Sequence, residues 1–246
     1  MLACWRGWDA LTWSCWRRCG IVARKPKRTW PWCVAARTQL INACRGMVKA
    51  MGGRLPKCTT GAFVGKVRTA IPPELQAALR PLLGSIRTLS EQIESCDRKI
   101  RSLTANEYPQ TKLLQQVKGV GPLVALTYVL TLEDPHRFAS SRAVGSYLGL
   151  CPRQSESGNS APQLGITKAG SSHLRRLLVQ SAHYTLSSLA SDSRLRRWGL
   201  ELASRGGKNG KRRAVIAVAR KLAVLLHKLW VTGQVYEPLH RISQAA

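Results

Sequence analysis

Residues 117–126 read VKGVGPLVAL, and this stretch decides the kind of fold to expect. Its two glycines flank Val120 and allow a tight turn between two helices, and an alanine follows the second glycine by four residues. The pattern is that of a helix–hairpin–helix motif, whose second helix presents free backbone N–H groups to a phosphate. We therefore predict that Lys118, Gly119 and Gly121 contact a nucleic-acid backbone. The alternative is a plain helix–turn–helix corner without a ligand.

Downstream of this hairpin the chain alternates between helical patterns and polar loops. Residues 152–170 form a polar loop that contains glycine, and an amphipathic helix follows it. The inward face of this helix is expected to hold Leu174, Leu177, Leu178 and Ala182. Its outward face is expected to offer His173, Arg175 and Arg176.

A basic run at residues 205–213, RGGKNGKRR, leads into a further helix. The apolar stripe of that helix consists of Val215, Val218, Leu222, Leu225, Leu226 and Leu229. A charge run is often only a solvated loop, but this one begins a helix in a strongly basic chain, so we predict phosphate contacts. The contacts predicted downstream of the hairpin are Arg153, Lys168, Arg175, Arg176, Lys208, Lys211, Arg212 and Arg213.

Upstream of the hairpin, a heptad of apolar residues runs through residues 75–103. It consists of Leu75, Leu79, Leu82, Ile86, Leu89, Ile93, Cys96, Ile100 and Leu103. Spacing of alternately four and three residues is typical of a coiled-coil helix, and its length gives an arm of about 40 Å. We predict that the arm pairs two copies of the chain into a homo-oligomer; packing on its own domain is the alternative. Pro81 is expected to kink or restart the helix.

The start of the chain has an unusual composition. Residues 1–35 hold six of the eight tryptophans and four of the eight cysteines, with Asp9 as the one carboxylate. No helical or alternating pattern organises them, which favours a shifted reading frame or a disordered segment; insertion at a membrane surface is the alternative. A helix is predicted over residues 37–51, ending at the glycine pair 52–53.

The charge of the chain indicates a nucleic-acid partner. Thirty-nine Lys and Arg against twelve Asp and Glu give a formal net charge of +27 in 246 residues. Such repulsion weakens a compact fold unless a polyanion neutralises it, and each neutralised phosphate releases a counterion. An acidic membrane or the ribosome is the alternative partner. The sequence contains no apolar run of about 18 residues, so no membrane span is predicted. The cysteines are dispersed along the chain, which favours free thiols in a reducing cytoplasm.

Several strings stand in a fixed order along the chain. They are LQQVKGVGP at 114–122, a segment from Phe138 that ends in SYLGLCP at 146–152, Ser157–Gly158, GITKAG at 165–170, Leu174–Arg175 and AVARKL at 217–222. Together they resemble the IS110/IS116/IS902 family of insertion-sequence transposases, relatives of the Piv invertase. The resemblance covers residues 36–240 and is densest from 111 to 232.

The resemblance implies a two-part protein. In that family a RuvC-like domain comes first and holds Mg²⁺ through four acidic residues, and a helical domain comes last and contributes a serine. The resemblance also implies DNA partners (the element's ends and the target) and a guide RNA from the element. By its place before a glycine, after the GLCP string, Ser157 takes the nucleophile role, with Ser155 and Ser160 as fallback choices. Ordinary turn chemistry is the alternative for Ser157.

Pattern and resemblance together predict a mainly α chain in four parts. Residues 1–35 are anomalous, and residues 36–70 are the remnant of the end of a RuvC-like domain. Residues 71–110 form the coiled-coil arm, and residues 111–240 form the helical transposase domain, which contains the hairpin.

The acidic tetrad is where the chain departs from the family. Asp9 is the only carboxylate before Glu74, and one Asp cannot supply four oxygen ligands to metal ions. We therefore expect a truncated transposase that binds DNA in the bacterial cytoplasm, at the nucleoid, holds no cofactor itself and is inactive alone. The main alternatives are a non-catalytic DNA-binding module and an inhibitor of the full-length transposase. A stand-alone helix–hairpin–helix repair protein is a third alternative.

Overall fold

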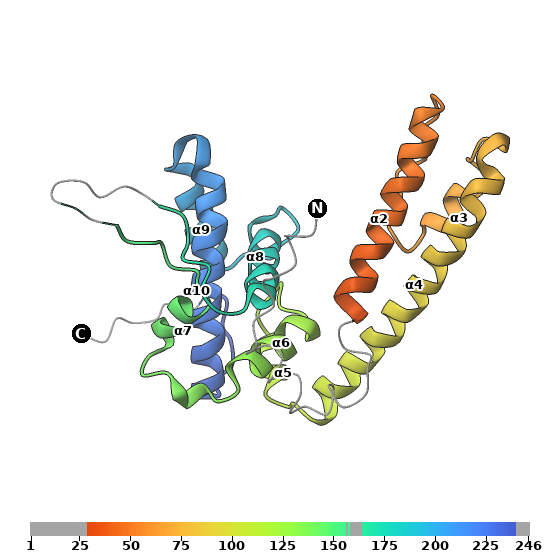
Figure 1. Ribbon diagram of the computed structural model, residues 1–246. Coiled ribbons are helices and arrows are strands. Elements are labelled where there is room, and N and C mark those ends of the chain that lie inside the picture. The colour runs from red at the N-terminus through yellow and green to blue at the C-terminus, as the bar shows by residue number, and fades with distance from the viewer. Residues whose placement is uncertain (1–28, 156, 158–163, 240–246) are drawn as a thin grey trace. The chain divides into compact units, whose positions relative to one another are not determined.

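The computed structural model describes residues 29–155, 157 and 164–239 (Figure 1). Every regular element in these ranges is a helix, which confirms the predicted mainly α fold. The chain falls into two compact units that divide between Lys99 and Ile100, and each has its own core. None of the helices in the described ranges has the length and apolar content needed to cross a membrane.

The first unit is a helical hairpin. It contains α2 (Thr29–Ala50), α3 (Phe63–Val67) and the start of α4 (Pro73–Asn106). The core of this unit consists of Ile41, Cys44, Val48, Phe63, Val67, Ile71, Leu79 and Ile86. Arg37 Nη1 of α2 donates to Ser90 Oγ of α4 at 3.4 Å. Apolar burial between the helices stabilises them, because isolated helices are marginal in water.

The helix α2 starts earlier than the sequence predicts. It begins at Thr29 rather than Arg37 and so includes part of the tryptophan-rich segment. Its end agrees with the prediction, since Gly52 follows with a φ of +78° and Gly53 N donates to Val48 O at 3.0 Å. The predicted start of this helix at Arg37 is therefore too late, and residues 1–28 lie outside the described residues.

The heptad of α4 is helical but packs within the chain. Leu79, Ile86 and Ile93 are buried, and the first two share one core with Ile41 and Val48 of α2. The other heptad positions are only half-buried. The face predicted to pair two copies is thus covered, at least over Leu79 and Ile86, by the chain's own α2.

Pro81 lies inside α4 without ending it. Of the two expected effects, a restart does not occur, because α4 is a single helix from Pro73 to Asn106. A kink at Pro81 stays a prediction. A proline removes one backbone hydrogen bond, and packing of the flanking turns onto α2 holds the helix together through this position.

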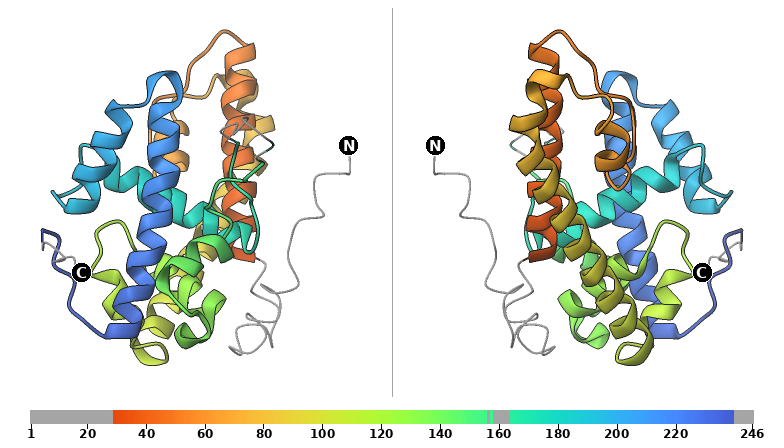
Figure 2. Two further views of the ribbon diagram at one scale, coloured as in Figure 1. Left: turned by 90° about the vertical axis from the view of Figure 1, so that its left-hand side faces the viewer. Right: turned by 90° about the vertical axis from the view of Figure 1, so that its right-hand side faces the viewer.

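The second unit is built around α10 (Gly210–Thr232). The helices around it are α5 (Thr111–Gln115), α6 (Pro122–Leu132), α7 (Ser141–Tyr147), α8 (Ser172–Leu186) and α9 (Arg194–Ser204), with short 3₁₀ turns η1 (Pro135–Arg137) and η2 (Gly207–Asn209). Helices α7, α8 and α9 each pack on α10, as Figure 2 shows. Gly199 permits the close crossing of α9 and α10, since a Cβ there would lie 2.5 Å from Val218 Cγ2.

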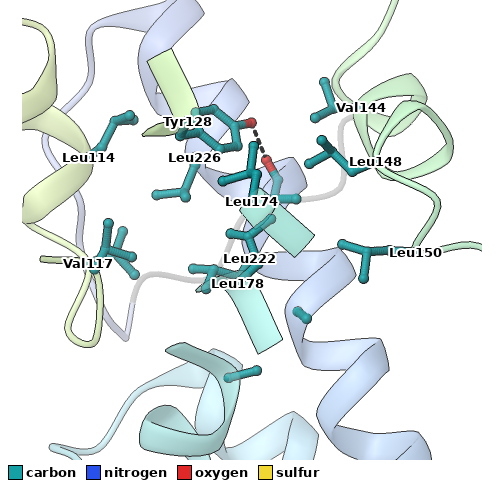
Figure 3. Close-up of a cluster of buried hydrophobic side chains, with 14 of the residues drawn as sticks. Leu114, Val117, Tyr128, Val144, Leu148, Leu150, Leu174, Leu178, Leu222 and Leu226 are labelled. Atoms are coloured by element: carbon teal, nitrogen blue, oxygen red, sulfur yellow. Dashed lines mark hydrogen bonds between the residues drawn. The ribbon is translucent and has the colours of Figure 1, made fainter. Parts of the chain in front are cut away.

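The core of the second unit lies where α5, α6, α8 and α10 meet (Figure 3). Leu222 of α10 packs there with Leu114 and Leu178. Tyr128 of α6 is fully buried, and its hydroxyl donates to Ala223 O at 2.7 Å. The predicted apolar stripes of α8 and α10 are confirmed, because their members are buried or half-buried in this core.

His227 fastens the loop after α6 to α10. Its ring is buried, and Nδ1 lies 3.0 Å from Ser141 Oγ while Nε2 lies 2.8 Å from Pro135 O. Both ring nitrogens therefore have polar partners, as a buried imidazole requires. The contact sets the position of η1 and α7, and α7 leads directly into the loop that contains Ser157.

Candidate nucleic-acid interface

The predicted hairpin turns at Gly119, between α5 and α6. Gly119 has a φ of +95°, which favours glycine, and a Cβ there would lie 3.0 Å from Tyr184 Cδ1 of α8. Gly121 has an extended backbone and precedes Pro122, the first residue of α6. The tight turn is confirmed at Gly119, whereas a Cβ at Gly121 would meet nothing within 4 Å. The side chain of Lys118 is exposed beside the turn.

Residues 149–170 are here called the serine loop. Its described segments, 149–155 and 164–170, leave the helices paired with each other (Figure 1). Arg153 N donates to Gly165 O and Thr167 N donates to Cys151 O, both at 2.9 Å. Ser157 follows the last of these pairs in the sequence, and its side chain is exposed. The backbone pairing therefore presents the predicted nucleophile outside the helical core.

Two glycines close the base of the serine loop. Gly149 and Gly170 have φ values of +64° and +63°. A Cβ at Gly149 would lie 2.2 Å from Ala169 N, and one at Gly170 would lie 2.2 Å from Tyr147 O. Lys168 N donates to Gly149 O at 3.1 Å. The strings LGLCP and TKAG are thus two sides of one junction, which sequence reasoning missed; its signal was a glycine at each end of the polar loop.

Arg175 of α8 belongs to this junction. Its Nη1 donates to Leu148 O at 3.0 Å and to Ala169 O at 2.6 Å. Nη1 of the Arg175 guanidinium is therefore directed at backbone carbonyls of the loop base. Contact of this half-buried side chain with phosphate stays a prediction. Arg176 is exposed as predicted. His173 is half-buried, and burial followed by the charge of Arg176 lowers its pKa.

The basic run at 205–213 forms the turn into α10. A Cβ on Gly206 would lie 2.5 Å from Gly210 Cα, so the turn is compact. Lys211, Arg212 and Arg213 occupy the first turn of α10 and are exposed. Cations at a helix N-terminus oppose the helix dipole, so this arrangement is unfavourable without an anion.

The remaining predicted contacts also lie at the surface. Arg153 and Lys168 of the serine loop are exposed. The ion pairs of the described residues, Arg197–Asp192 and Arg205–Glu201, engage none of the exposed cations predicted to contact phosphate. The side chain of Lys208 lies outside the described residues.

A metal site like that of the family does not fit the described residues. Within residues 29–155, 157 and 164–239, no three His, Cys, Asp or Glu side chains are grouped so that they could hold a metal ion. Ser155 is exposed beside Ser157, and Ser160 lies outside the described residues. The described part of the chain therefore offers a serine and cations, but not the carboxylate ligands of a Mg²⁺ site.

Comparison with known proteins supports the resemblance seen in the sequence. The model of the transposase IS116/IS110/IS902 family matches residues 111–197. The chain is 31% identical to the transposase for insertion sequence element IS1111A of Coxiella burnetii, over 82% of this chain and 57% of that protein. It is 30% identical to a probable family 20 transposase of Pseudomonas aeruginosa, over 83% of this chain and 62% of that protein.

A third relative agrees with these two. The transposase for insertion sequence element IS1328 of Yersinia enterocolitica is 33% identical over 68% of this chain and 49% of its own length. The chain thus spans about half to three fifths of the length of these relatives. The family match covers the hairpin, the serine loop and α8, whose geometry is described above. The chain therefore belongs to the transposase IS116/IS110/IS902 family.

Proposed function

We propose that this chain is a DNA-binding part of an insertion-sequence transposase and holds the element's DNA through its exposed cations. The observation that carries this proposal is the first turn of α10, where Lys211, Arg212 and Arg213 are exposed at the positive end of a helix. A phosphate there gains both the side-chain charges and the helix N-terminus. The net charge of +27 favours the same kind of partner.

Binding of labelled duplex that carries the element's ends tests this proposal. The variant Lys211→Gln/Arg212→Gln/Arg213→Gln should bind more weakly in fluorescence anisotropy. Its plot of log K against log salt concentration should also be less steep by about 2 to 3 units, since each lost phosphate contact removes about 0.9.

A matched control removes the same charge from α4. The variant Arg98→Gln/Lys99→Gln/Arg101→Gln changes three exposed cations and leaves the net charge equal to that of the first variant. It should keep most of the affinity and the slope. Equal losses in both variants would mean that binding follows net charge alone, and the assignment to α10 would be withdrawn.

We further propose that Ser157 is the strand-transfer nucleophile of the assembled transposase. Attack of the Ser157 hydroxyl oxygen on a phosphodiester forms a serine O–P bond, breaks the P–O bond to the neighbouring nucleotide and releases that strand end as a hydroxyl. A base or metal takes the serine proton. The described residues do not fit a metal site, so the carboxylates are proposed to come from outside the described residues. The chain alone, with duplex, the element's RNA and Mg²⁺, should bind without forming a covalent adduct.

The adduct assay separates the two proposals. An adduct that forms with the chain alone and disappears with Ser157→Ala would confirm the nucleophile and overturn the need for outside carboxylates. An adduct that persists in Ser157→Ala would remove the assignment of Ser157, without affecting the DNA-binding proposal.

A second candidate function is a non-catalytic binding module that inhibits the complete transposase. The lack of fit to a metal site among the described residues favours it. Added to the full-length transposase of the same element, the chain should then lower strand exchange as its concentration rises. The triple variant of α10 should inhibit less if inhibition works through shared DNA.

A further inference from the structure

An open groove lies between α9, α10 and the segment after α10. Its volume is about 550 Å³, and apolar side chains of α10 line it, among them Val224, Leu225 and Leu229. The opposite wall is formed by residues 234–238. The groove lies wholly in the second unit and away from the serine loop in the sequence.

The wall formed by residues 234–238 is held at two points. Tyr236 N donates to the side-chain oxygen Oε1 of Gln116 at 2.7 Å. Arg194 N, at the start of α9, donates to Pro238 O at 2.9 Å. These bonds fix the segment to α9 and to the loop before α6, so both walls of the groove have a defined position.

Three cations line this apolar groove. They are Arg194 of α9 and Lys221 and Lys228 of α10, and Glu237 is the one carboxylate among the lining residues. Lys221 Nζ lies 3.9 Å from the centroid of the Trp198 ring, so a cation–π contact holds the ammonium. Burial, and then the charge of Arg194, lower the pKa of Lys221. An anion in the groove would relieve this repulsion.

The spacing of these residues selects the kind of anion. Lys221, Leu225 and Lys228 follow one another at four and three residues and so share one face of α10, with the Cα atoms of the two lysines about 10 Å apart along its axis. The basic turn at 205–213 is rich in cations and suits a phosphate backbone. The groove instead alternates charge with apolar surface, as sites for amphipathic helices do.

We propose that this groove binds an acidic amphipathic helix of another protein. Leucine-like side chains would occupy the apolar floor, and Glu or Asp side chains one or two turns apart would pair with Lys221 and Lys228. The volume of about 550 Å³ is large enough for several side chains, as in other binding sites. The proposal is independent of DNA binding by the first turn of α10.

A peptide pair tests the proposal on the full chain. One labelled 18-residue peptide has leucines at helical spacing with glutamates between them, and the other has the same composition scrambled so that no apolar face forms. Because a chain of charge +27 attracts any acidic peptide, the difference between the two is the readout. The amphipathic peptide should bind at least about ten-fold more tightly in fluorescence anisotropy.

Matched charge reversals locate the binding. Lys221→Glu/Lys228→Glu should weaken binding of the amphipathic peptide at least about ten-fold. Lys211→Glu/Arg212→Glu changes the net charge by the same amount and should leave the affinity for this peptide nearly unchanged. Lys228→Glu alone, at an exposed position without the Trp198 contact, keeps the test valid if the double variant folds poorly. The single variant Lys228→Glu should also bind the amphipathic peptide more weakly than the unchanged chain does.

Four outcomes would overturn the proposal. The first is equally tight binding of the scrambled peptide, and the second is an equal loss of peptide binding in both charge reversals. The third is a larger loss of duplex-DNA affinity in the groove variant than in the α10 variant, which would make nucleic acid the occupant. The fourth is self-association in sedimentation that the groove variant abolishes, which would make a second copy of the chain the occupant.

Discussion

At the scale of single residues, the junction under the serine loop depends on backbone space. Gly170→Ala would place a Cβ 2.2 Å from Tyr147 O, at a φ of +63°. We expect the free energy of unfolding to fall by about 1–3 kcal/mol, measured by urea denaturation. Gly165→Ala, in the same loop with nothing within 4 Å of its Cβ, should be neutral or slightly stabilising. Equal midpoints for the two variants would contradict the steric argument.

Tyr128 makes a buried hydrogen bond that can be removed with little change of shape. Tyr128→Phe deletes the hydroxyl that donates to Ala223 O at 2.7 Å. The free energy of unfolding should fall by about 1 kcal/mol, the net value of a typical hydrogen bond. Tyr184→Phe, at a side chain that is 43% exposed, is the control and should change it far less. A stability loss as large in the control would show that the hydroxyl of Tyr128 is not the cause.

His173 couples stability to pH. Burial, and then Arg176, lower its pKa from 6.5, so the unfolded chain binds a proton more readily than the folded chain. The free energy of unfolding should therefore fall as pH drops below about 6.5. The urea midpoint of the His173→Gln variant should drop less between about pH 7 and pH 5 than the midpoint of the unchanged chain. Parallel profiles for the two proteins would exclude His173 as the source.

At the scale of helices, α4 is packed against its own chain. Ile86 is fully buried in the core that includes Ile41 and Val48 of α2, so Ile86→Ala should destabilise the first unit by about 2–5 kcal/mol. Arg87→Ala, at the exposed neighbouring position, should cost little. Both are measured by thermal unfolding followed by circular dichroism.

The same variant addresses the predicted oligomer. If α4 pairs two copies through this face, Ile86→Ala should dissociate them at concentrations where the fold persists, as sedimentation would show. Since α2 covers Leu79 and Ile86, we expect the oligomeric state to be unchanged. A homo-oligomer, if present, would then be held together by surface outside this core.

At the scale of the whole molecule, charge opposes the fold. A net charge of +27 is repulsive, while the ion pairs Arg197–Asp192 and Arg205–Glu201 are exposed, and exposed pairs contribute little. Raising the salt concentration should therefore increase the thermal midpoint, because screening weakens the repulsion. Duplex DNA at low salt should increase it further, by binding the folded state. A midpoint that falls with salt would mean that attractive pairs dominate.

Local patterns in the sequence determined much of this protein. The heptad of α4, the glycine turn at Gly119 and the apolar stripes of α8 and α10 are periodic or confined to a few residues. Each depends on backbone geometry that neighbouring residues specify. The order of short strings was likewise enough to indicate the family, because residues 114–222 carry these strings in a fixed order.

Only the tertiary structure shows which residues contact each predicted apolar face or cation. Leu79 and Ile86 of the heptad pack with α2 of the same chain, and Arg175 Nη1 donates to Leu148 O and Ala169 O. The groove beside Lys221 joins α9, α10 and residues 234–238. Periodicity shows that a face is apolar, or that a cation is present, but it carries no information about what lies opposite. That depends on contacts between residues far apart in the chain, which only the folded core brings together.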